Sequence, residues 1–179
     1  RFLLGKIATI VGNLLVEQAR AGAQILMVFD SHAGVLNRQL FNHFLMNPLS
    51  EVIRIVKESN ISVPLIYFAK GGHFVINELL DTQFDVIAVD WSIEPREIKL
   101  AKFNSIRQTN KTLMGNLDPA VLYGSKDQIK VEVRRVLESF KQHKHIFNLG
   151  HGIYPDIDPE SVQTIVDEIR NINVKIHII

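Results

Sequence analysis

The chain has 179 residues, the size of one ordinary domain, and its 46% apolar content is enough to form a sizeable buried core. Twenty basic and nineteen acidic side chains give a formal charge of +1, so we expect neither nucleic acid nor a membrane surface as a partner. The absence of cysteine excludes disulfides and thiolate metal sites, and we expect a cytoplasmic setting.

The first predicted element is a helix from about Phe2 to Arg20. Its apolar residues recur at intervals of three and four, and Gly22 is well placed to end it. The chain starts at Arg1 and enters this periodicity with no capping residue before it. We therefore expect this beginning to be a cut rather than a natural start.

Beyond this helix, short apolar runs alternate with segments of helical period. The runs are Gln24–Phe29, Pro64–Ala69, Asp85–Val89, Lys111–Met114 and His145–Leu149, and the helical segments lie near residues 37–59, 73–80, 94–104, 125–140 and 159–171. Runs that are apolar on both faces predict a parallel sheet covered by helices. The apolar stretches fall well short of the roughly 20 residues of a membrane span, so we expect a soluble protein.

Two of the predicted helices have recognisable starts. Ser125 and Gln128 have the spacing of a capping box. Asp158, Pro159 and Glu160 supply an N-cap, a proline at the first helical position and an early carboxylate.

Each apolar run ends in a cluster of small or polar residues. The clusters are Asp30–Gly34, Lys70–His73, Asp90–Trp91, Gly115–Pro119 and Gly150–Gly152. A Rossmann-type sheet concentrates its site at one switch point, whereas a (β/α)8 barrel collects loops from every strand around one mouth. Because all five predicted strands end in small or polar residues, the pattern favours the barrel. A complete barrel has eight units and about 250 residues. We predict an α/β fold containing about the last five βα units of a TIM barrel, as a single domain over residues 1–179 with its N-terminal part absent.

Two residues are the leading candidates for binding a substrate. His151 lies between two glycines after the last predicted strand, where the backbone can bring an imidazole close to a ligand. The alternative is a histidine satisfied by loop backbone. Ser31 follows the first strand and can donate a hydrogen bond to an anionic substrate, although Asp30 or Ser31 could instead cap the following helix.

The other strand ends carry polar residues with a more structural interpretation. Asn116 or Asp118 is expected to organise a βα turn through side-chain hydrogen bonds, with Pro119 opening the next helix. The indole in Asp90–Trp91 either lines a wall or packs beneath a loop. Lys70–His73 lacks the glycine spacing and the ending of a P-loop.

A metal site is not favoured by the pattern of histidines. The available oxygen and nitrogen ligands are His32, His73, His151, Asp30, Asp90 and Asp118. The His-x-His pair, His143 and His145, enters a strand rather than leaving it, and lysines stand beside it. We expect these two histidines on a solvated face, and neither a metal nor a cofactor in the site.

Five blocks together carry a resemblance that covers nearly the whole chain. In order, they are Phe29–Gly34, Tyr67–Phe74, Asp90–Trp91, Gly115–Pro119 and Asn148–Asp156. They closely resemble the uroporphyrinogen decarboxylase family of the eukaryotic type. The resemblance implies a carbon-carbon lyase that removes the carboxyl groups of the four acetate side chains of uroporphyrinogen III, giving coproporphyrinogen III in haem biosynthesis. It also implies a cytoplasmic homodimer that needs no metal or organic cofactor.

The resemblance assigns roles to the two leading candidates. Ser31 matches the substrate-binding serine of the family, and His151 matches its histidine near the carboxylate side chains of the substrate. The catalytic aspartate and the N-terminal arginines of the family fall outside this sequence, so we expect no catalytic residue within it and no activity from the fragment alone. Met114 stands where the family often has glutamine, and the stretch 102–110 looks longer than usual.

Two other interpretations remain open at this point. The cobalamin-linked methyltransferases of the same fold hold zinc through histidine and cysteine, and the absence of cysteine counts strongly against them. A truncated product with no catalytic role is the other alternative, and its open sheet edges would favour aggregation.

Overall fold

The computed structural model describes residues 2–95, 98 and 111–172. The chain comprises two compact units, residues 1–87 and 88–179. Each unit is described by itself below. Whether residues 1–179 behave as a single domain stays a prediction.

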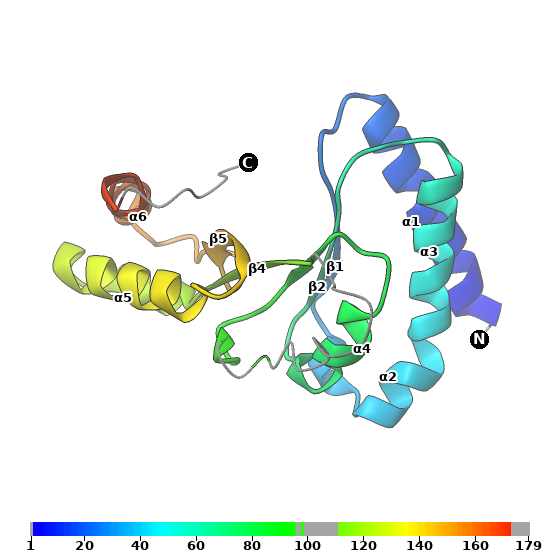
Figure 1. Ribbon diagram of the computed structural model, residues 1–179, viewed down its shortest axis with the longest axis horizontal. Helices are drawn as coiled ribbons and strands as arrows, with labels where there is room; N and C mark the ends of the chain where they lie inside the picture. The colour runs from blue at the N-terminus through cyan, green and yellow to red at the C-terminus, as the bar shows by residue number, and fades with distance from the viewer. Residues whose placement is uncertain (1, 96–97, 99–110, 173–179) are drawn as a thin grey trace. The chain divides into compact units, whose positions relative to one another are not determined.

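The first unit alternates helices and strands (Figure 1). Its elements are α1 (Phe2–Arg20), β1 (Leu26–Asp30), the 3-10 helix η1 (Ala33–Val35), α2 (Arg38–Phe44), α3 (Met46–Glu58), β2 (Leu65–Ala69), the 3-10 helix η2 (His73–Val75) and α4 (Ile76–Leu80). β1 and β2 are parallel, with register from Leu26 opposite Leu65 to Asp30 opposite Ala69. The predicted first helix is confirmed at both ends, and the helix expected near 37–59 is two helices that meet at Leu45.

The core of the first unit lies around β2, in which all five side chains are buried. Tyr67 of this strand stacks on Phe84, with 5.0 Å between ring centroids. α1 lies alongside α3 (Figure 1), and a Cβ at Gly12 would come within 2.9 Å of the Ile55 side chain. Glycine at this position therefore lets the two helices approach closely.

The exposed side of α1 is apolar as well. Ala8, Gly12, Leu15 and Val16 are buried, whereas the large side chains Phe2, Leu3, Ile7, Ile10 and Leu14 are exposed. By length and composition alone, α1 is long and apolar enough to cross a membrane. Helices buried inside soluble proteins can meet the same criterion.

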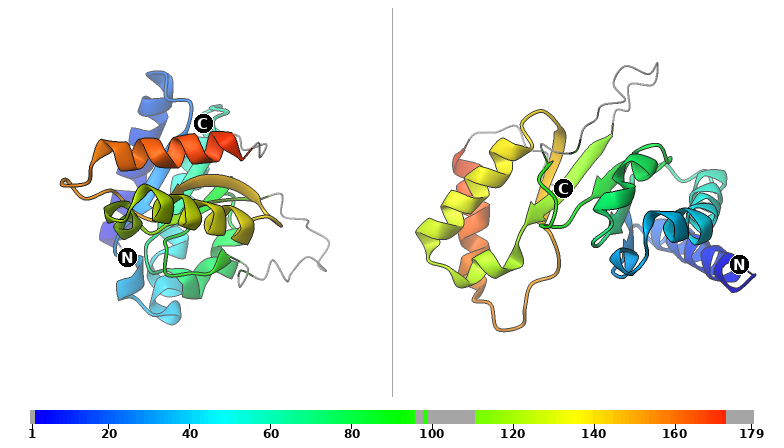
Figure 2. Two further views of the ribbon diagram at one scale, coloured as in Figure 1. Left: turned by 90° about the vertical axis from the view of Figure 1, so that its left-hand side faces the viewer. Right: turned by 90° about the horizontal axis from the view of Figure 1, so that it is seen from below.

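The second unit contains β4 (Thr112–Leu117), the 3-10 helix η4 (Pro119–Tyr123), α5 (Lys126–Ser139), β5 (Lys144–Leu149) and α6 (Pro159–Asn171). β4 and β5 are parallel, and Leu117 lies opposite Leu149 where both strands end. α5 and α6 lie side by side (Figure 2). The capping box of Ser125 and Gln128 is confirmed, as is the Asp158 cap, whose side chain accepts from the Glu160 N–H.

β3 (Val86–Ala88) runs across the boundary between the units. Just before it, Asp85 N–H donates to the Leu65 carbonyl, and just after it, Val89 N–H donates to the Met114 carbonyl. The strands accordingly follow one another in chain order, β1-β2-β3-β4-β5. The predicted α/β alternation of strands and helices is confirmed.

One strand is longer than expected. β4 continues through Gly115, Asn116 and Leu117, which the sequence analysis assigned to a turn. Gly115 has φ +136°, and a Cβ there would lie 2.5 Å from the carbonyl oxygen of Val89, so only glycine fits this part of the strand. The helix expected near 94–104 and the long stretch 102–110 fall mainly outside the described residues.

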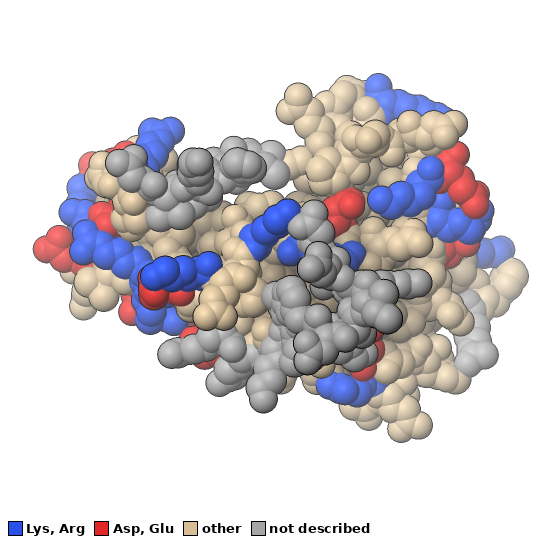
Figure 3. All heavy atoms as spheres, in the orientation of Figure 1, with Lys and Arg blue, Asp and Glu red and all other residues tan. Residues whose placement is uncertain are grey.

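The surface carries both signs of charge. On the face shown in Figure 3, Lys and Arg side chains lie among Asp and Glu side chains. Several are paired within one helix, as Arg54 is with Glu51 and Glu58 on α3. Such exposed pairs contribute little to stability, and their mixture is consistent with the net charge of +1.

Candidate functional site

In the first unit, the loops that follow β1 and β2 are joined at the carboxyl edge of the strands. Lys70 N–H donates to the Asp30 carbonyl at 3.0 Å, and Gly34 N–H donates to the Lys70 carbonyl at 2.8 Å. A Cβ at Gly34 would lie 3.0 Å from the Cα of Gly71. The two loops therefore pack backbone against backbone, and glycine at both positions allows this approach.

The Asp30 carboxylate is held by a side chain from the neighbouring strand. Tyr67 Oη donates to Asp30 Oδ2 at 2.8 Å, and His32 N–H donates to Oδ1 at 3.3 Å. Tyr67 is buried, and its burial together with the adjacent Asp30 charge raises its pKa above the ordinary value. The phenol thus stays protonated and remains a hydrogen-bond donor. The sequence analysis missed Tyr67, although a tyrosine within a fully buried strand needs a partner for its hydroxyl.

Ser31 lies beside this carboxylate and is exposed. The interpretation of Asp30 or Ser31 as a helix cap is wrong, because η1 begins after His32 and α2 is capped by Asn37. The Asn37 side chain accepts from the Leu40 N–H at 2.9 Å. Since the helix starts are provided by other residues, the Ser31 hydroxyl is placed at the strand end without a capping role.

In the second unit, Asn116 of β4 fixes the loop that follows β3. Its side-chain Nδ2 donates to the Asp90 carbonyl and to the Ile93 carbonyl, both at 2.8 Å, and the residue is 5% exposed. Asp118 accepts from the Ala120 N–H at 2.9 Å and caps η4. The expectation that these side chains organise backbone is confirmed for both residues.

The Asp90 carboxylate is also used within its own loop. Its Oδ1 accepts from the Ser92 N–H at 2.8 Å and from the Ser92 hydroxyl. The residue is 5% exposed, so these hydrogen bonds satisfy a carboxylate that water reaches poorly. Asp90 therefore holds the shape of its loop.

His151 is exposed and lies beside Trp91. The two rings meet edge to face, with centroids 6.2 Å apart and an angle of 88° between their planes. A Cβ at Gly150 would lie 2.6 Å from the Trp91 backbone nitrogen, so the loop after β5 touches the loop after β3. The indole, 38% exposed, therefore flanks the candidate histidine rather than lying beneath a loop.

The segment beyond His151 is tied to η4 by aromatic and polar contacts. Tyr154 stacks on Tyr123, with ring centroids 6.1 Å apart. The Tyr123 hydroxyl donates to Asp156 Oδ1 at 2.7 Å, and this hydrogen bond to a carboxylate raises the pKa of Tyr123 to about 12. These contacts give the exposed loop a defined path past the strand ends.

The expectation that His143 and His145 lie on a solvated face is wrong. His145 stacks flat on Phe140, with ring centroids 3.8 Å apart, and its Nε2 lies 2.6 Å from the Gly115 carbonyl. Burial lowers the pKa of His145 to about 4, and it also lowers the pKa of His143. The neighbouring lysines were misleading, because successive side chains of a strand alternate between its faces.

Ser31 and His151 belong to different units, so each is placed only within its own unit. Within the described part of the chain, no group of three or more His, Cys, Asp or Glu side chains is placed to hold a metal ion. Each unit nevertheless presents an exposed candidate side chain beside a loop fixed by hydrogen bonds.

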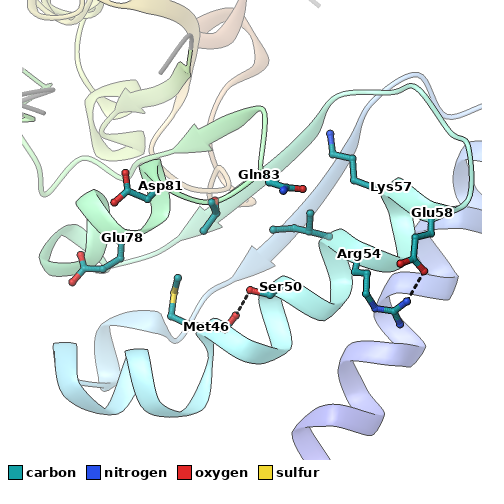
Figure 4. A pocket seen from close by; sticks show the side chains of 10 residues that line it. Met46, Ser50, Arg54, Lys57, Glu58, Glu78, Asp81 and Gln83 are labelled. Atoms are coloured by element: carbon teal, nitrogen blue, oxygen red, sulfur yellow. Dashed lines mark hydrogen bonds and ion pairs between the residues drawn. The ribbon is translucent and has the colours of Figure 1, made fainter. Parts of the chain in front are cut away.

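A cavity of about 490 Å³ lies elsewhere in the first unit (Figure 4). Residues of α3, α4 and the turn after α4 line it, among them Met46, Arg54, Glu78 and Asp81. None of the residues around it is a candidate from the strand ends. The cavity therefore lies among residues of the helices and the turn after α4, and neither Ser31 nor His151 lines it.

The family model described as uroporphyrinogen decarboxylase matches residues 1–172. The chain is similar to three proteins named uroporphyrinogen decarboxylase. It is 40% identical to that of Danio rerio over 94% of this chain and 46% of the relative. It is 42% identical to that of Homo sapiens over 87% of this chain and 42% of the relative. It is 35% identical to that of Chlorobaculum parvum over 98% of this chain and 50% of the relative. The chain spans about half the length of these relatives. Matched along most of its length, the chain belongs to the uroporphyrinogen decarboxylase family.

Proposed function

We propose that this chain is the carboxyl-terminal half of an enzyme that decarboxylates the four acetate side chains of uroporphyrinogen III to give coproporphyrinogen III. The observation that carries the proposal is the family match over residues 1–172, with the relatives sharing 35 to 42% identity. The exposed positions of Ser31 and His151 at strand ends support it, since ligands of α/β barrels bind at the carboxyl ends of the strands.

In this proposal the chain contributes substrate contacts. The Ser31 hydroxyl donates a hydrogen bond to a carboxylate of the substrate, and His151 faces its acidic side chains. An anionic ligand loses hydration when it binds, so donors of this kind offset part of the desolvation cost. Loops already fixed by Tyr67 and Asn116 hold these donors in place before the ligand arrives.

The chemical step needs groups beyond these contacts. Decarboxylation of a pyrrole acetate is helped by protonating the ring carbon, because the electrons left by departing CO2 then have a cationic acceptor. A proton donor and an anionic group that stabilises the cation must both be present. By resemblance to the family, both lie in the half of the enzyme that precedes this sequence, and we expect the 179-residue chain alone to be inactive.

The remaining parts of the proposal rest on the same resemblance. The full protein works without a metal or an organic cofactor, in the cytoplasm, as a homodimer, and its partner is the tetrapyrrole substrate rather than nucleic acid or a membrane. The relatives come from a bacterium and from two vertebrates, in keeping with a reaction that many organisms share.

The test compares the 179-residue chain with a chimera. In the chimera, the residues of the human relative that precede the matched region are joined to this chain. Both proteins are incubated with uroporphyrinogen, and the release of coproporphyrinogen is followed. We expect turnover by the chimera alone. Turnover by the isolated chain would contradict the requirement for the other half, and a folded chimera without turnover would contradict the proposed activity.

A further inference from the structure

The second unit contains a buried side chain whose hydrogen bonds reach the exposed histidine through one intervening loop. We propose that Asn116 is a positioning residue that holds Trp91 beside His151. The name "90–93 loop" is used here for residues 90–93, which connect the end of β3 to the segment after it. The inference rests on the proposed function only for the role of His151 in binding substrate. The geometry itself is tested without substrate or turnover.

The hydrogen bonds of Asn116 account for the position of the 90–93 loop. One amide nitrogen donates to the carbonyls of Asp90 and Ile93, at the two ends of the loop, both at 2.8 Å. Because Asn116 is 5% exposed, water has little access to replace these donors. A side chain without an amide would leave two carbonyl groups without their donor, which is costly when they are shielded from solvent.

The interior of the 90–93 loop is closed by a second set of contacts. The Asp90 carboxylate accepts from both the backbone N–H and the hydroxyl of Ser92. These hydrogen bonds set the shape of the loop, and those of Asn116 set its position on β4. Moving the loop as one piece would therefore break the Asn116 hydrogen bonds.

The 90–93 loop in turn limits where His151 can lie. Gly150 approaches the Trp91 backbone so closely that a Cβ would be 2.6 Å from its nitrogen. The Trp91 ring then stands edge to face against the His151 ring at 6.2 Å. An imidazole confined on one side by an indole has fewer orientations to lose when a ligand binds, which favours affinity for an acidic side chain.

The chain provides its own reporter of this contact, because Trp91 is its sole tryptophan. A protonated imidazole in contact with an indole quenches its fluorescence, so Trp91 emission is followed while the pH is lowered, and contact with His151 should produce a quenching step. We expect the quenching step in the 179-residue chain. His151→Gln should abolish it, which identifies the quencher.

The decisive variant is Asn116→Leu, which keeps a side chain of similar size and removes both donors. We expect the quenching step to be lost, although His151 is intact, because the 90–93 loop no longer holds the indole in place. Asn148→Leu is the matched control: Asn148 lies opposite Asn116 on β5, and its side chain accepts from the Leu149 N–H instead. It should keep the step.

Far-UV circular dichroism establishes that each variant is folded. If Asn116→Leu loses its helical signal, Asn116→Ser replaces it, and its single hydroxyl donor should leave a smaller step than in the parent chain. A full step in the folded Asn116 variant, or a step that survives His151→Gln, would overturn the proposal. Either result leaves the decarboxylase assay of the chimera unaffected, so failure here is distinct from failure of the proposed function.

Discussion

In the first unit, the carboxylate at a strand end is held by a side chain from the adjacent strand, whereas in the second unit it is held by its own loop. Tyr67 of β2 donates to Asp30, the last residue of β1. Asp90 instead accepts from Ser92 two residues away, and an amide from the next strand fixes the loop through its backbone. The first arrangement depends on one buried tyrosine hydroxyl. The second depends on hydrogen bonds that Ser92 and Asn116 donate to Asp90 and to the backbone of its loop.

The two arrangements have one consequence in common: both strand-end carboxylates are used within the protein. Both Asp30 and Asp90 accept hydrogen bonds from the protein that shape their loops. Ser31 and His151 are exposed, and they are the proposed substrate contacts. That the chain supplies binding contacts, with the catalytic groups elsewhere, stays a prediction.

The largest expected effect concerns backbone packing in the second unit. Gly115→Ala places a Cβ 2.5 Å from the Val89 carbonyl oxygen, at φ +136°. We expect a loss of about 3 kcal/mol in the free energy of unfolding, measured by urea denaturation followed through Trp91 fluorescence. Gly152→Ala, which would meet nothing within 4 Å, is the control. Equal stability of the two variants would show that the close approach of the strand is not needed.

The pH dependence of stability should also be concentrated in the second unit. The pKa of His145 is about 4, below the ordinary value of about 6.5, so the unfolded chain binds more protons between these values. Stability should be constant above pH 6.5 and fall as the pH is lowered towards 4, by about 3 kcal/mol in total. Urea denaturation across this range measures the fall. His145→Gln should flatten it, leaving the smaller contribution of His143, and an unchanged slope would refute the assignment.

A smaller effect separates the two tyrosine–aspartate pairs. Tyr67→Phe removes a buried donor from Asp30 and should cost about 1 to 2 kcal/mol of unfolding free energy. Tyr123→Phe removes a similar hydrogen bond to Asp156, but on the exposed surface, and should cause no measurable loss. Thermal unfolding followed by circular dichroism compares the variants. Equal losses would mean that burial does not distinguish the pairs.

The smallest expected effect is on substrate binding. In the chimera, Ser31→Ala removes one donor to a substrate carboxylate and should raise KM about tenfold, the equivalent of one hydrogen bond to a charged group. The value of kcat should change little, because the ground state and the transition state share this contact. Steady-state kinetics with uroporphyrinogen provide the measurement. A fall in kcat at constant KM would instead place Ser31 in the chemical step.

Sequence patterns predicted the elements well because periodicity and capping are local properties. The ends of the first and last helices and the Ser125 capping box follow directly from neighbouring residues. The continuation of β4 through Asn116 was missed, because glycine and asparagine usually indicate turns. The partners that make Asn116 acceptable inside a strand lie more than twenty residues away in the sequence.

The sequence offered candidate residues for the site, whose roles stay a prediction, but not their contacts. Ser31 and His151 were identified from strand ends and from the family resemblance, which also indicated their roles. The Tyr67 contact to Asp30 and the edge-to-face packing of Trp91 depend on how loops distant in the sequence meet. The burial of His145 was missed for the same reason, since Phe140 and Gly115 cover it from other elements.

The most direct test of the proposed function is coproporphyrinogen release by the chimera, compared with the same chimera carrying Ser31→Ala and His151→Ala together. We predict turnover by the parent chimera and a loss of about 100-fold or more in kcat/KM in the double variant, the sum of two hydrogen bonds to charged groups. A folded parent chimera without turnover, or a double variant as active as the parent, would contradict the account.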